Sequence, residues 1–340
     1  MLSTVIRAFL PEMESYSLMP IGSGLIHHTW KVETPGGRAH ILQEVNTGVF
    51  RDPEAIAHNL SLIGRYLGAE APEYSFVPPM QTADGAVFYR DERGVFYRMF
   101  PFVSGSRTYD IVSSPEQAFE ASRQFGLFTR NLRGFDVGQL RETLPHFHDL
   151  VLRYEQFDRA VCTGDDSRVS SCSELIEFLR GQRGLVEVYE GLKDDPGFRL
   201  RVTHHDTKIS NVLFDQRDKG LCVIDLDTVM PGYFISDVGD MVRTYVSPAS
   251  EEEMDLDKVV VRREFYQAIY DGYLGEMGDV LSDSERARFS YAGLFMAYMQ
   301  ALRFLTDHLT GDVYYGARYK GHNYSRAANQ ARLLQELMEL

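Results

Sequence analysis

The chain has 340 residues, 44% of them hydrophobic and 12% aromatic, which is enough for two globular domains or one domain with a smaller lobe. A formal net charge of −14 makes nucleic acids and anionic membranes unfavourable partners. The three cysteines form no C-x-x-C pair, and no apolar run has the pattern of a secretion signal or the length of a membrane span. We therefore expect a cytoplasmic protein without a disulfide framework.

The first hundred residues are rich in β-branched and aromatic residues and predict a small β-rich lobe. The turn signals Pro35-Gly36-Gly37 and Asp84-Gly85 separate its strands. The expected strands cover residues 25–33, 38–45, 86–90 and 94–100. One helix interrupts them from about Pro53 to Leu67, with Asp52 as its cap and proline in its first turn.

Helical periodicity dominates after the stretch PFVSG at 101–105. The expected helices cover residues 115–132, 150–162, 172–192, 235–246, 255–275, 283–309 and 325–340. A short β-like insertion within this part covers residues 199–203, 212–215 and 221–224. We predict an N-terminal lobe of residues 1–100, a hinge of residues 101–105, and a larger, mainly helical lobe of residues 106–340.

The strongest motif is H-x-D-x-x-x-x-N within residues 202–215, directly ahead of an apolar strand, and the next apolar strand ends at Asp225. Phosphoryl transfer needs a carboxylate that orients the attacking hydroxyl and oxygen ligands that hold Mg²⁺ against the phosphates. Protein kinases use an H-R-D-x-x-x-x-N loop and a later aspartate for these tasks. We therefore predict Asp206 as the catalytic carboxylate and Asn211 and Asp225 as magnesium ligands.

Other polar residues of this region have less specific signals, because a single histidine or aspartate in a loop is usually a turn or cap residue. Lys208, two residues after the catalytic carboxylate, is expected to neutralise charge that develops on the transferred phosphoryl group. His204 is expected to tie the loop to nearby backbone, and His205 has no assigned role. Asp227 leaves two interpretations open, a second ion site or a contact with a helix end.

Two weaker signals fit ATP binding. The residues Gly22, Ser23 and Gly24 precede a β-like run, and glycines in such a turn let backbone amides approach phosphates. The residues Phe100, Phe102 and Val103 lie where a kinase hinge offers backbone groups and apolar side chains to adenine. An ordinary glycine turn and a plain apolar linker are the alternatives.

The sequence after Asp225 favours a small acceptor. A protein kinase has a long activation segment between its magnesium aspartate and an A-P-E motif. The A-P-E triplet of this chain, at residues 71–73, lies upstream of the catalytic loop, and Asp225 is soon followed by D-V-G-D at 237–240. This leaves no room for a platform that docks a polypeptide.

The H-x-D-x-x-x-x-N loop, the I-D-L-D sequence and the D-V-G-D sequence resemble the aminoglycoside phosphotransferase and choline kinase superfamily. Longer stretches resemble the N-acetylhexosamine 1-kinases within it. These stretches are HILQEVNTGVF (40–50), HFHD (146–149), RVTHHDTKISNVLFD (201–215), IDLDTVMPGYFISDVGDMVR (224–243) and LRFLTDHLTGDVYYGARYKGHNYSR (302–326). The resemblance implies an α+β, protein-kinase-like, two-lobed fold that uses ATP and Mg²⁺.

The resemblance also implies an acceptor, the anomeric hydroxyl of N-acetylglucosamine or N-acetylgalactosamine, converted to the sugar 1-phosphate. Arg303 and Tyr314 match positions expected to contact the sugar, since arginine can bond several sugar oxygens and tyrosine can cover an apolar sugar face. A salt bridge that anchors a helix is the alternative for Arg303. His146 and His148 have either a ligand contact or a structural role at a helix start.

Two departures from the expected patterns stand out. Gln43 occupies the strand position where protein kinases place a lysine for the α- and β-phosphates, and His27 stands where the resemblance leads us to expect asparagine. The acceptor therefore stays open to other small alcohols, namely an aminoglycoside, choline, homoserine or another sugar. The missing lysine also raises the alternative of an inactive pseudokinase that senses nucleotide or sugar. The sequence does not indicate an oligomeric state.

Overall fold

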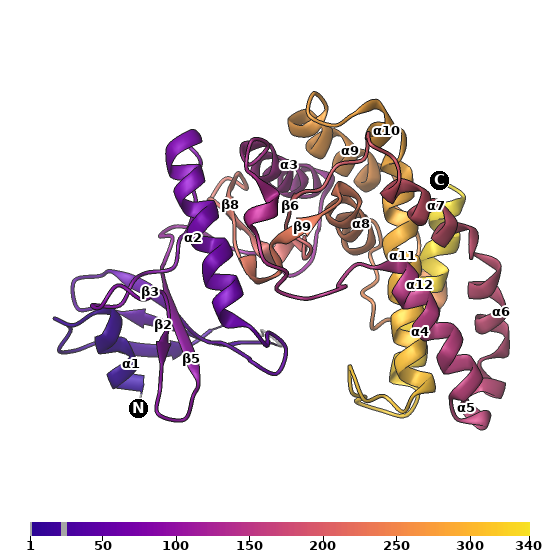
Figure 1. Ribbon diagram of the computed structural model, residues 1–340, viewed down its shortest axis with the longest axis horizontal. Coiled ribbons are helices and arrows are strands. Elements are labelled where there is room, and N and C mark those ends of the chain that lie inside the picture. The colour runs from indigo at the N-terminus through magenta and orange to yellow at the C-terminus, as the bar shows by residue number, and fades with distance from the viewer. Residues whose placement is uncertain (1, 22–25) are drawn as a thin grey trace. The chain divides into compact units, whose positions relative to one another are not determined.

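The computed structural model describes residues 2–21 and 26–340, and these residues form two compact units (Figure 1). The N-terminal unit comprises residues 1–108, 131–145 and 212–231. The C-terminal unit comprises residues 109–130, 146–211 and 232–340. The predicted order, a β-rich first part followed by a mainly helical part, is confirmed. The exact domain limits stay a prediction.

An antiparallel sheet forms the centre of the N-terminal unit. In spatial order its strands are β1 (Ser17–Pro20), β2 (His28–Glu33), β3 (Ala39–Glu44), β5 (Phe96–Pro101) and β4 (Tyr89–Arg90). Side chains of a strand alternate between its two faces, so Leu42 and Gln43 of β3 face opposite ways. Leu42 belongs to the core, whereas Gln43 pairs in register with Arg98 of β5 on the other face.

Helix α1 (Leu2–Phe9) covers the core face of this sheet. It buries its apolar residues Val5, Ile6 and Phe9 against Val32, Leu42, Tyr97 and Met99. Neither α1 nor β1 is predicted from the sequence. A helix of eight residues is unstable in isolation, and burial against the sheet stabilises this one.

Helix α2 (Pro53–Glu70) begins as predicted. The side chain of Asp52 accepts a hydrogen bond from the amide of Ala55 at 3.0 Å, and Pro53 occupies the first turn, where its missing N–H costs nothing. The hairpin of β7 (Val212–Phe214) and β8 (Gly220–Val223) belongs to the same unit. Arg107 and Phe214 exchange two backbone hydrogen bonds of 2.9 Å, which join the hairpin to the chain after the hinge.

The C-terminal unit is mainly helical. Its helices are α3 (Pro115–Asn131), α4 (Leu150–Thr163), α5 (Asp166–Ser171), α6 (Ser173–Gly181), α7 (Gly184–Lys193), α8 (Phe234–Tyr245), α9 (Arg263–Met277), α10 (Asp283–Ala287), α11 (Phe289–Leu309) and α12 (His322–Met338). Short strands β6 (Arg201–Thr203) and β9 (Met230–Gly232) complete the elements. Helix α11 is buried along most of its length and packs against α4, α8 and α12 (Figure 1).

Three predicted helices have different limits in the structure. The segment 172–192 is divided into α6 and α7 at residues 182–183, between two glycines that weaken helix continuation. The segment 255–275 begins with a 3₁₀ turn capped by Asp255, so α9 starts only at Arg263. The segment 283–309 is interrupted at Arg288. Within the described residues, no helix combines the length and apolarity needed to cross a lipid bilayer.

Candidate functional site

The predicted catalytic loop follows β6 and is held in place by α8. The backbone amides of His204 and His205 donate to the two carboxylate oxygens of Asp237 at 3.0 and 2.7 Å. The amide of Thr207 donates to Asp240 at 2.8 Å. Burial raises the pKa of Asp237 to about 6. The two aspartates of the D-V-G-D sequence therefore fix the backbone of the loop.

The glycine of the same sequence serves helix packing. A Cβ atom on Gly239 would lie 2.4 Å from the carbonyl oxygen of Ala292 on α11. Only glycine lets α8 approach α11 this closely. The D-V-G-D sequence thus combines loop anchoring and close packing within one helical turn.

The structure brings together Asp206, Lys208 and Asn211, three of the residues predicted from the motif. Lys208 Nζ lies 3.1 Å from Asp206 Oδ1, and the negative charge of Asp206 raises the pKa of Lys208. Asn211 Nδ2 donates to the carbonyl oxygen and to Oδ2 of Asp206, at 2.9 and 3.1 Å. This orientation leaves the side-chain oxygen of Asn211 as its possible ligand atom for a hard cation.

The histidine that precedes this cluster is structural, as expected. His204 is fully buried, and its ring packs edge-on against Phe125 at 5.1 Å. Its Nδ1 accepts a hydrogen bond from the amide of Asp206 at 3.4 Å.

The two aspartates that follow β8 have opposite surroundings in the N-terminal unit. Asp225 is exposed, and its backbone adopts the left-handed conformation with φ 58°. Asp227 is buried, and the guanidinium of Arg98 donates to both of its carboxylate oxygens. Burial alone raises the pKa of Asp227, but Arg98 and His27 outweigh it and hold the pKa below its ordinary value. The carboxylate of Asp227 is thus hydrogen-bonded by both Arg98 and His27.

Of the two residues that depart from the expected patterns, His27 bonds this carboxylate and Gln43 bonds its partner Arg98. His27 Nδ1 accepts the amide of Asn46 at 3.1 Å, so its Nε2 carries the proton and donates to Asp227 at 2.8 Å. Gln43 Oε1 accepts a hydrogen bond from Nε of Arg98 at 3.0 Å. His27 and Gln43 stand where the sequence patterns led us to expect asparagine and lysine. Both residues therefore have structural partners within this group.

In the C-terminal unit, Arg303 and Tyr314, the two residues expected to contact the sugar, lie close together. The guanidinium carbon of Arg303, on α11, lies 5.4 Å from the ring centre of Phe147, 5.9 Å from that of Tyr314 and 5.5 Å from that of Tyr315. Arg303 is only 9% exposed. Within the described part of the chain no carboxylate forms an ion pair with it, and its hydrogen bond is a long one of 3.4 Å to Gln300. A helix-anchoring salt bridge is therefore not what holds this side chain.

Buried polar atoms without partners surround Arg303. Among the described residues, Nδ1 of His148, Nε of Arg153 and the hydroxyl of Tyr315 have no hydrogen-bond partner. His148 stacks on Phe147 at 4.4 Å and lies 5.2 Å from His205 of the catalytic loop. Burial lowers the pKa of His148 well below its ordinary value, and neighbouring positive charges, of which His205 contributes most, lower it further. A neutral imidazole, a phenol and two guanidiniums thus lie near one another, and buried polar atoms of this kind normally have a ligand or water as a partner.

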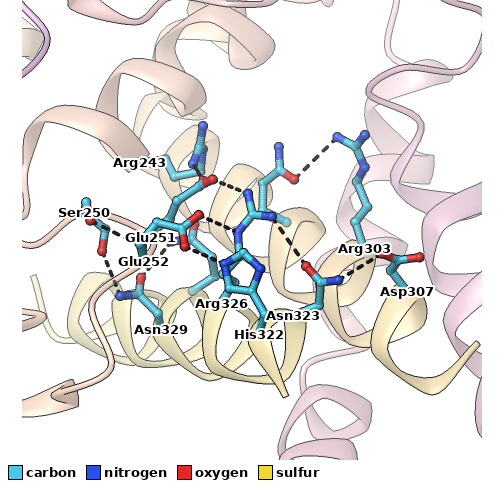
Figure 2. Close-up of polar contacts among 12 residues, drawn as sticks. Arg243, Ser250, Glu251, Glu252, Arg303, Asp307, His322, Asn323, Arg326 and Asn329 are labelled. Atoms are coloured by element: carbon cyan, nitrogen blue, oxygen red, sulfur yellow. Dashed lines mark hydrogen bonds and ion pairs between the residues drawn. The ribbon is translucent and has the colours of Figure 1, made fainter. Parts of the chain in front are cut away.

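A polar network holds the loop that carries Tyr314. Asp307 of α11 accepts the amides of Tyr314 and Tyr315 at 2.7 and 2.9 Å, and Asn323 of α12 donates to Asp307 at 3.0 Å. Figure 2 shows how this group continues through Arg326, which bonds Glu251, to Arg243 of α8. Because Asp240 bonds both Thr207 and Arg243, one chain of polar contacts links the catalytic loop with the surroundings of Arg303.

The predicted nucleotide contacts are described only in part. Gly22, Ser23 and Gly24 lie outside the described residues. Phe100 lies on β5 beneath the Arg98 guanidinium at 5.1 Å, and Lys31 Nζ lies 4.7 Å from the ring centre of Phe102. The amide of Phe102 donates to Ala39, and the carbonyl of Val103 accepts from Ser106. Adenine contact at the hinge stays a prediction.

Sequence reasoning missed several residues around Arg303. Phe147, Arg153, Tyr315 and Asp307 were not singled out, although the first lies inside the HFHD sequence and the last two inside the long segment at 302–326. Their role depends on rings and unpaired atoms that only a folded structure brings together.

A family profile described as the phosphotransferase enzyme family, APH, matches residues 17–281. Solved structures with a similar fold include an aminoglycoside phosphotransferase from Alicyclobacillus acidocaldarius, with a TM-score of 0.65, 12% identity, and coverage of 99% of this chain and 95% of that one. A microcompartment-associated aminopropanol kinase has a TM-score of 0.66, 15% identity, and coverage of 99% and 97%. The amicoumacin kinase hAmiN, solved with AMP-PNP and Ca²⁺, has a TM-score of 0.62, 15% identity, and coverage of 99% and 92%. These likenesses confirm the predicted kinase-like α+β fold.

Proposed function

This chain belongs to the phosphotransferase enzyme family, and we propose that it transfers the γ-phosphoryl group of ATP to the anomeric hydroxyl of an N-acetylhexosamine. The observation that carries the choice of acceptor is the group around Arg303. A buried guanidinium without a carboxylate partner is costly, and three buried polar atoms around it are unpaired as well. A ligand rich in hydroxyl and carbonyl oxygens satisfies all of them at once.

The charge of this group favours a neutral acceptor over a cationic one. Arg303 lies near a second arginine, Arg153, whose pKa is lowered by burial and by the charge of Arg303. Two guanidiniums would repel a cationic amine, and among the described residues no carboxylate paired with Arg303 would offset this repulsion. An acetamido sugar offers a carbonyl and several hydroxyls to the donors, and an apolar ring face to Phe147 and Tyr314.

The catalytic loop supports direct, in-line transfer. Asp206 orients the sugar hydroxyl and accepts its proton, and Lys208, held protonated beside it, neutralises charge on the migrating phosphoryl group. Asn211 keeps Asp206 in place through its two hydrogen bonds. Gly22, Ser23, Gly24 and the hinge segment with Phe100, Phe102 and Val103 complete the proposal as the nucleotide-binding residues.

Asn211 and Asp225 are the magnesium ligands of this proposal, because hard cations prefer the amide and carboxylate oxygens that these side chains carry. Asp225 is exposed after β8, and the hydrogen bonds of Asn211 leave its side-chain oxygen for a cation. When bound, Mg²⁺ neutralises the charge of the phosphates and orients them.

An acceptor panel tests the proposal. The purified protein is incubated with MgATP and N-acetylglucosamine, N-acetylgalactosamine, glucose, choline, homoserine, aminopropanol or kanamycin, and ADP release is measured. Phosphorus NMR then locates the new phosphate. We expect a sugar 1-phosphate from an N-acetylhexosamine, and a preference for any amine acceptor would contradict the acceptor assignment.

The variant Asp206→Asn tests the catalytic assignment. We expect turnover to fall by about 10²–10⁴-fold, while MgATP binding measured by calorimetry stays unchanged. Asp166→Asn, an exposed aspartate on α5, is the control and keeps full turnover. Near-normal turnover of Asp206→Asn would show that Asp206 is not the base. ATP binding by the wild type without turnover on any acceptor would favour a pseudokinase.

A further inference from the structure

The buried group around Asp227 contains an arginine beside the strand position where the expected lysine is absent. Arg98 is 1% exposed, and it stands directly across the strand pair from Gln43, the position where protein kinases carry their phosphate-binding lysine. Three of its five N–H groups are used, one by Gln43 and two by Asp227. A permanent positive charge therefore lies on β5, directly beside the β3 position where a lysine was expected.

The partner of this charge lies two residues after the predicted magnesium ligand. Ligand atoms of His27, Asp225 and Asp227 all lie within 4.8 Å of one another. Taken by composition alone, two carboxylates and an imidazole at that separation look like a site for a divalent ion.

The hydrogen bonds of the group argue against such a site in the native protein. Both oxygens of Asp227 accept from Arg98. Nδ1 of His27 accepts a hydrogen bond from the Asn46 amide. Nε2 of His27 therefore carries the ring proton and donates a hydrogen bond to Asp227. The ligand atoms of Asp227 and His27 are thus already used in hydrogen bonds within the protein.

We propose that Arg98 is a positioning residue that keeps Asp227 out of metal coordination, so that Asp225 alone of the I-D-L-D sequence faces the metal. The same contacts tie β5, β3, the residues after the glycine loop and the turn after β8 into one rigid group around Asp227. The guanidinium also offsets the charge of the second carboxylate, which would otherwise add to that of Asp225. This inference depends on the proposed function only through the role of Asp225.

Metal binding to the nucleotide-free protein provides the test. Mn²⁺ is titrated into wild type, Arg98→Gln and the double variant Arg98→Gln/Asp227→Asn, and free Mn²⁺ is followed by electron paramagnetic resonance. We expect Arg98→Gln to bind Mn²⁺ about 10-fold more tightly than wild type, because a second carboxylate becomes a ligand. The double variant should return to the wild-type affinity. Equal affinity of Arg98→Gln and wild type would overturn the proposal.

Thermal unfolding distinguishes this role from general structural damage. Asp227 without Arg98 is a buried, uncompensated charge, so Arg98→Gln should lower Tm, and removing both charges should recover about half of that loss or more. A double variant no more stable than Arg98→Gln would contradict the proposal, and this comparison holds even where Arg98→Gln is too unstable for titration. Arg93→Gln is the control, because Arg93 bonds Asp91 in the turn between β4 and β5 of the same unit, and it should leave Mn²⁺ affinity unchanged.

None of these measurements requires an acceptor or turnover. Failure of the acceptor panel would leave the Mn²⁺ result intact, and failure of the Mn²⁺ test would leave the kinase assignment intact. The activity of Arg98→Gln adds one further readout. We expect its turnover with MgATP to fall by about 10-fold or more through misplacement of Asp225.

Discussion

Two buried arginines in this molecule have opposite surroundings. Arg98 in the N-terminal unit donates to Gln43 and to both oxygens of Asp227. Arg303 in the C-terminal unit is nearly as buried, yet within the described residues it has no carboxylate partner, and its contacts are three aromatic rings and a long hydrogen bond to Gln300. A buried charge is costly unless it is compensated. The fold itself compensates the first arginine, and we propose that a ligand compensates the second.

The hydrogen bonding of the residues near each arginine supports the same contrast. The residues that contact Arg98 all have partners, including His27 through both of its nitrogens. The residues near Arg303 include His148 and Tyr315, whose buried polar atoms have no partner among the described residues. Completeness of hydrogen bonding, rather than burial or residue type, separates a structural arginine from a ligand-binding one.

The largest expected effect is on stability at Arg98. Replacing it by methionine in Arg98→Met leaves Asp227 buried without its cationic partner, which should cost about 3–5 kcal/mol. Arg303→Met should cost less than about 1 kcal/mol, because it removes a charge that the unliganded protein does not compensate. Urea unfolding followed by circular dichroism measures both. Equal losses in the two variants would end the distinction between the two arginines.

The second effect is on catalysis at Arg303. Arg303→Met should lower kcat/KM for the acceptor by about 100-fold, equivalent to about 2.7 kcal/mol, while KM for MgATP stays unchanged. Steady-state kinetics with each substrate varied in turn measure this. Arg180→Met is the control, since Arg180 pairs with Asp158 at 2.7 Å elsewhere in the same unit. A rise in KM for MgATP alone would place Arg303 on the nucleotide side.

The third effect is on acid stability and concerns Glu251. Burial alone raises the pKa of this carboxyl, but Arg243 and Arg326 outweigh it and hold the pKa at about 2. A folded-state pKa below the unfolded value means that the stabilisation is complete above about pH 4.5 and is lost as the pH falls toward 2. Glu251→Gln should cost about 2 kcal/mol at pH 7 and should lose less stability than wild type between pH 4.5 and 2.

Unfolding of Glu251→Gln and wild type at a series of pH values measures this difference. Glu253→Gln is the matched control, because Glu253 is a carboxylate of the same loop with the same exposure as Glu251, but its ion pair is with Lys258, an exposed residue. If wild type and Glu251→Gln lost the same amount of stability between pH 4.5 and 2, the ion pairs of Glu251 in Figure 2 would not contribute to folding.

The sequence predicted the parts of the molecule whose signal is local. The cap Asp52, the strands β3 and β5 and the loop cluster of Asp206, Lys208 and Asn211 depend on neighbouring residues or on a motif with fixed spacing. Helix α1 could not be predicted, because its stability comes from a distant sheet face. The break between α6 and α7 was missed because the apolar periodicity continues across it.

The departures at Gln43 and His27 were visible in the sequence, but their explanation was not. Each residue bonds a partner that comes from a different strand or turn, Arg98 or Asp227, and nothing in the spacing of the sequence indicates such pairing. The same holds for Arg303, whose lack of a partner is a property of the folded chain. Sequence motifs therefore indicated the chemistry, and the structure indicated which charges are already compensated.

The smallest expected effect concerns Tyr314, which is 73% exposed although its ring lies near Arg303. A ring that covers a sugar face stabilises the complex through apolar contact, so Tyr314→Ala should raise the acceptor KM by about 10-fold, or about 1.4 kcal/mol. Tyr314→Phe keeps the ring and should stay within about 2-fold of wild type. Acceptor titrations at saturating MgATP measure both variants. If phenylalanine were as harmful as alanine, the hydroxyl rather than the ring would contact the acceptor, and Tyr314 would act as a hydrogen-bonding group like Arg303.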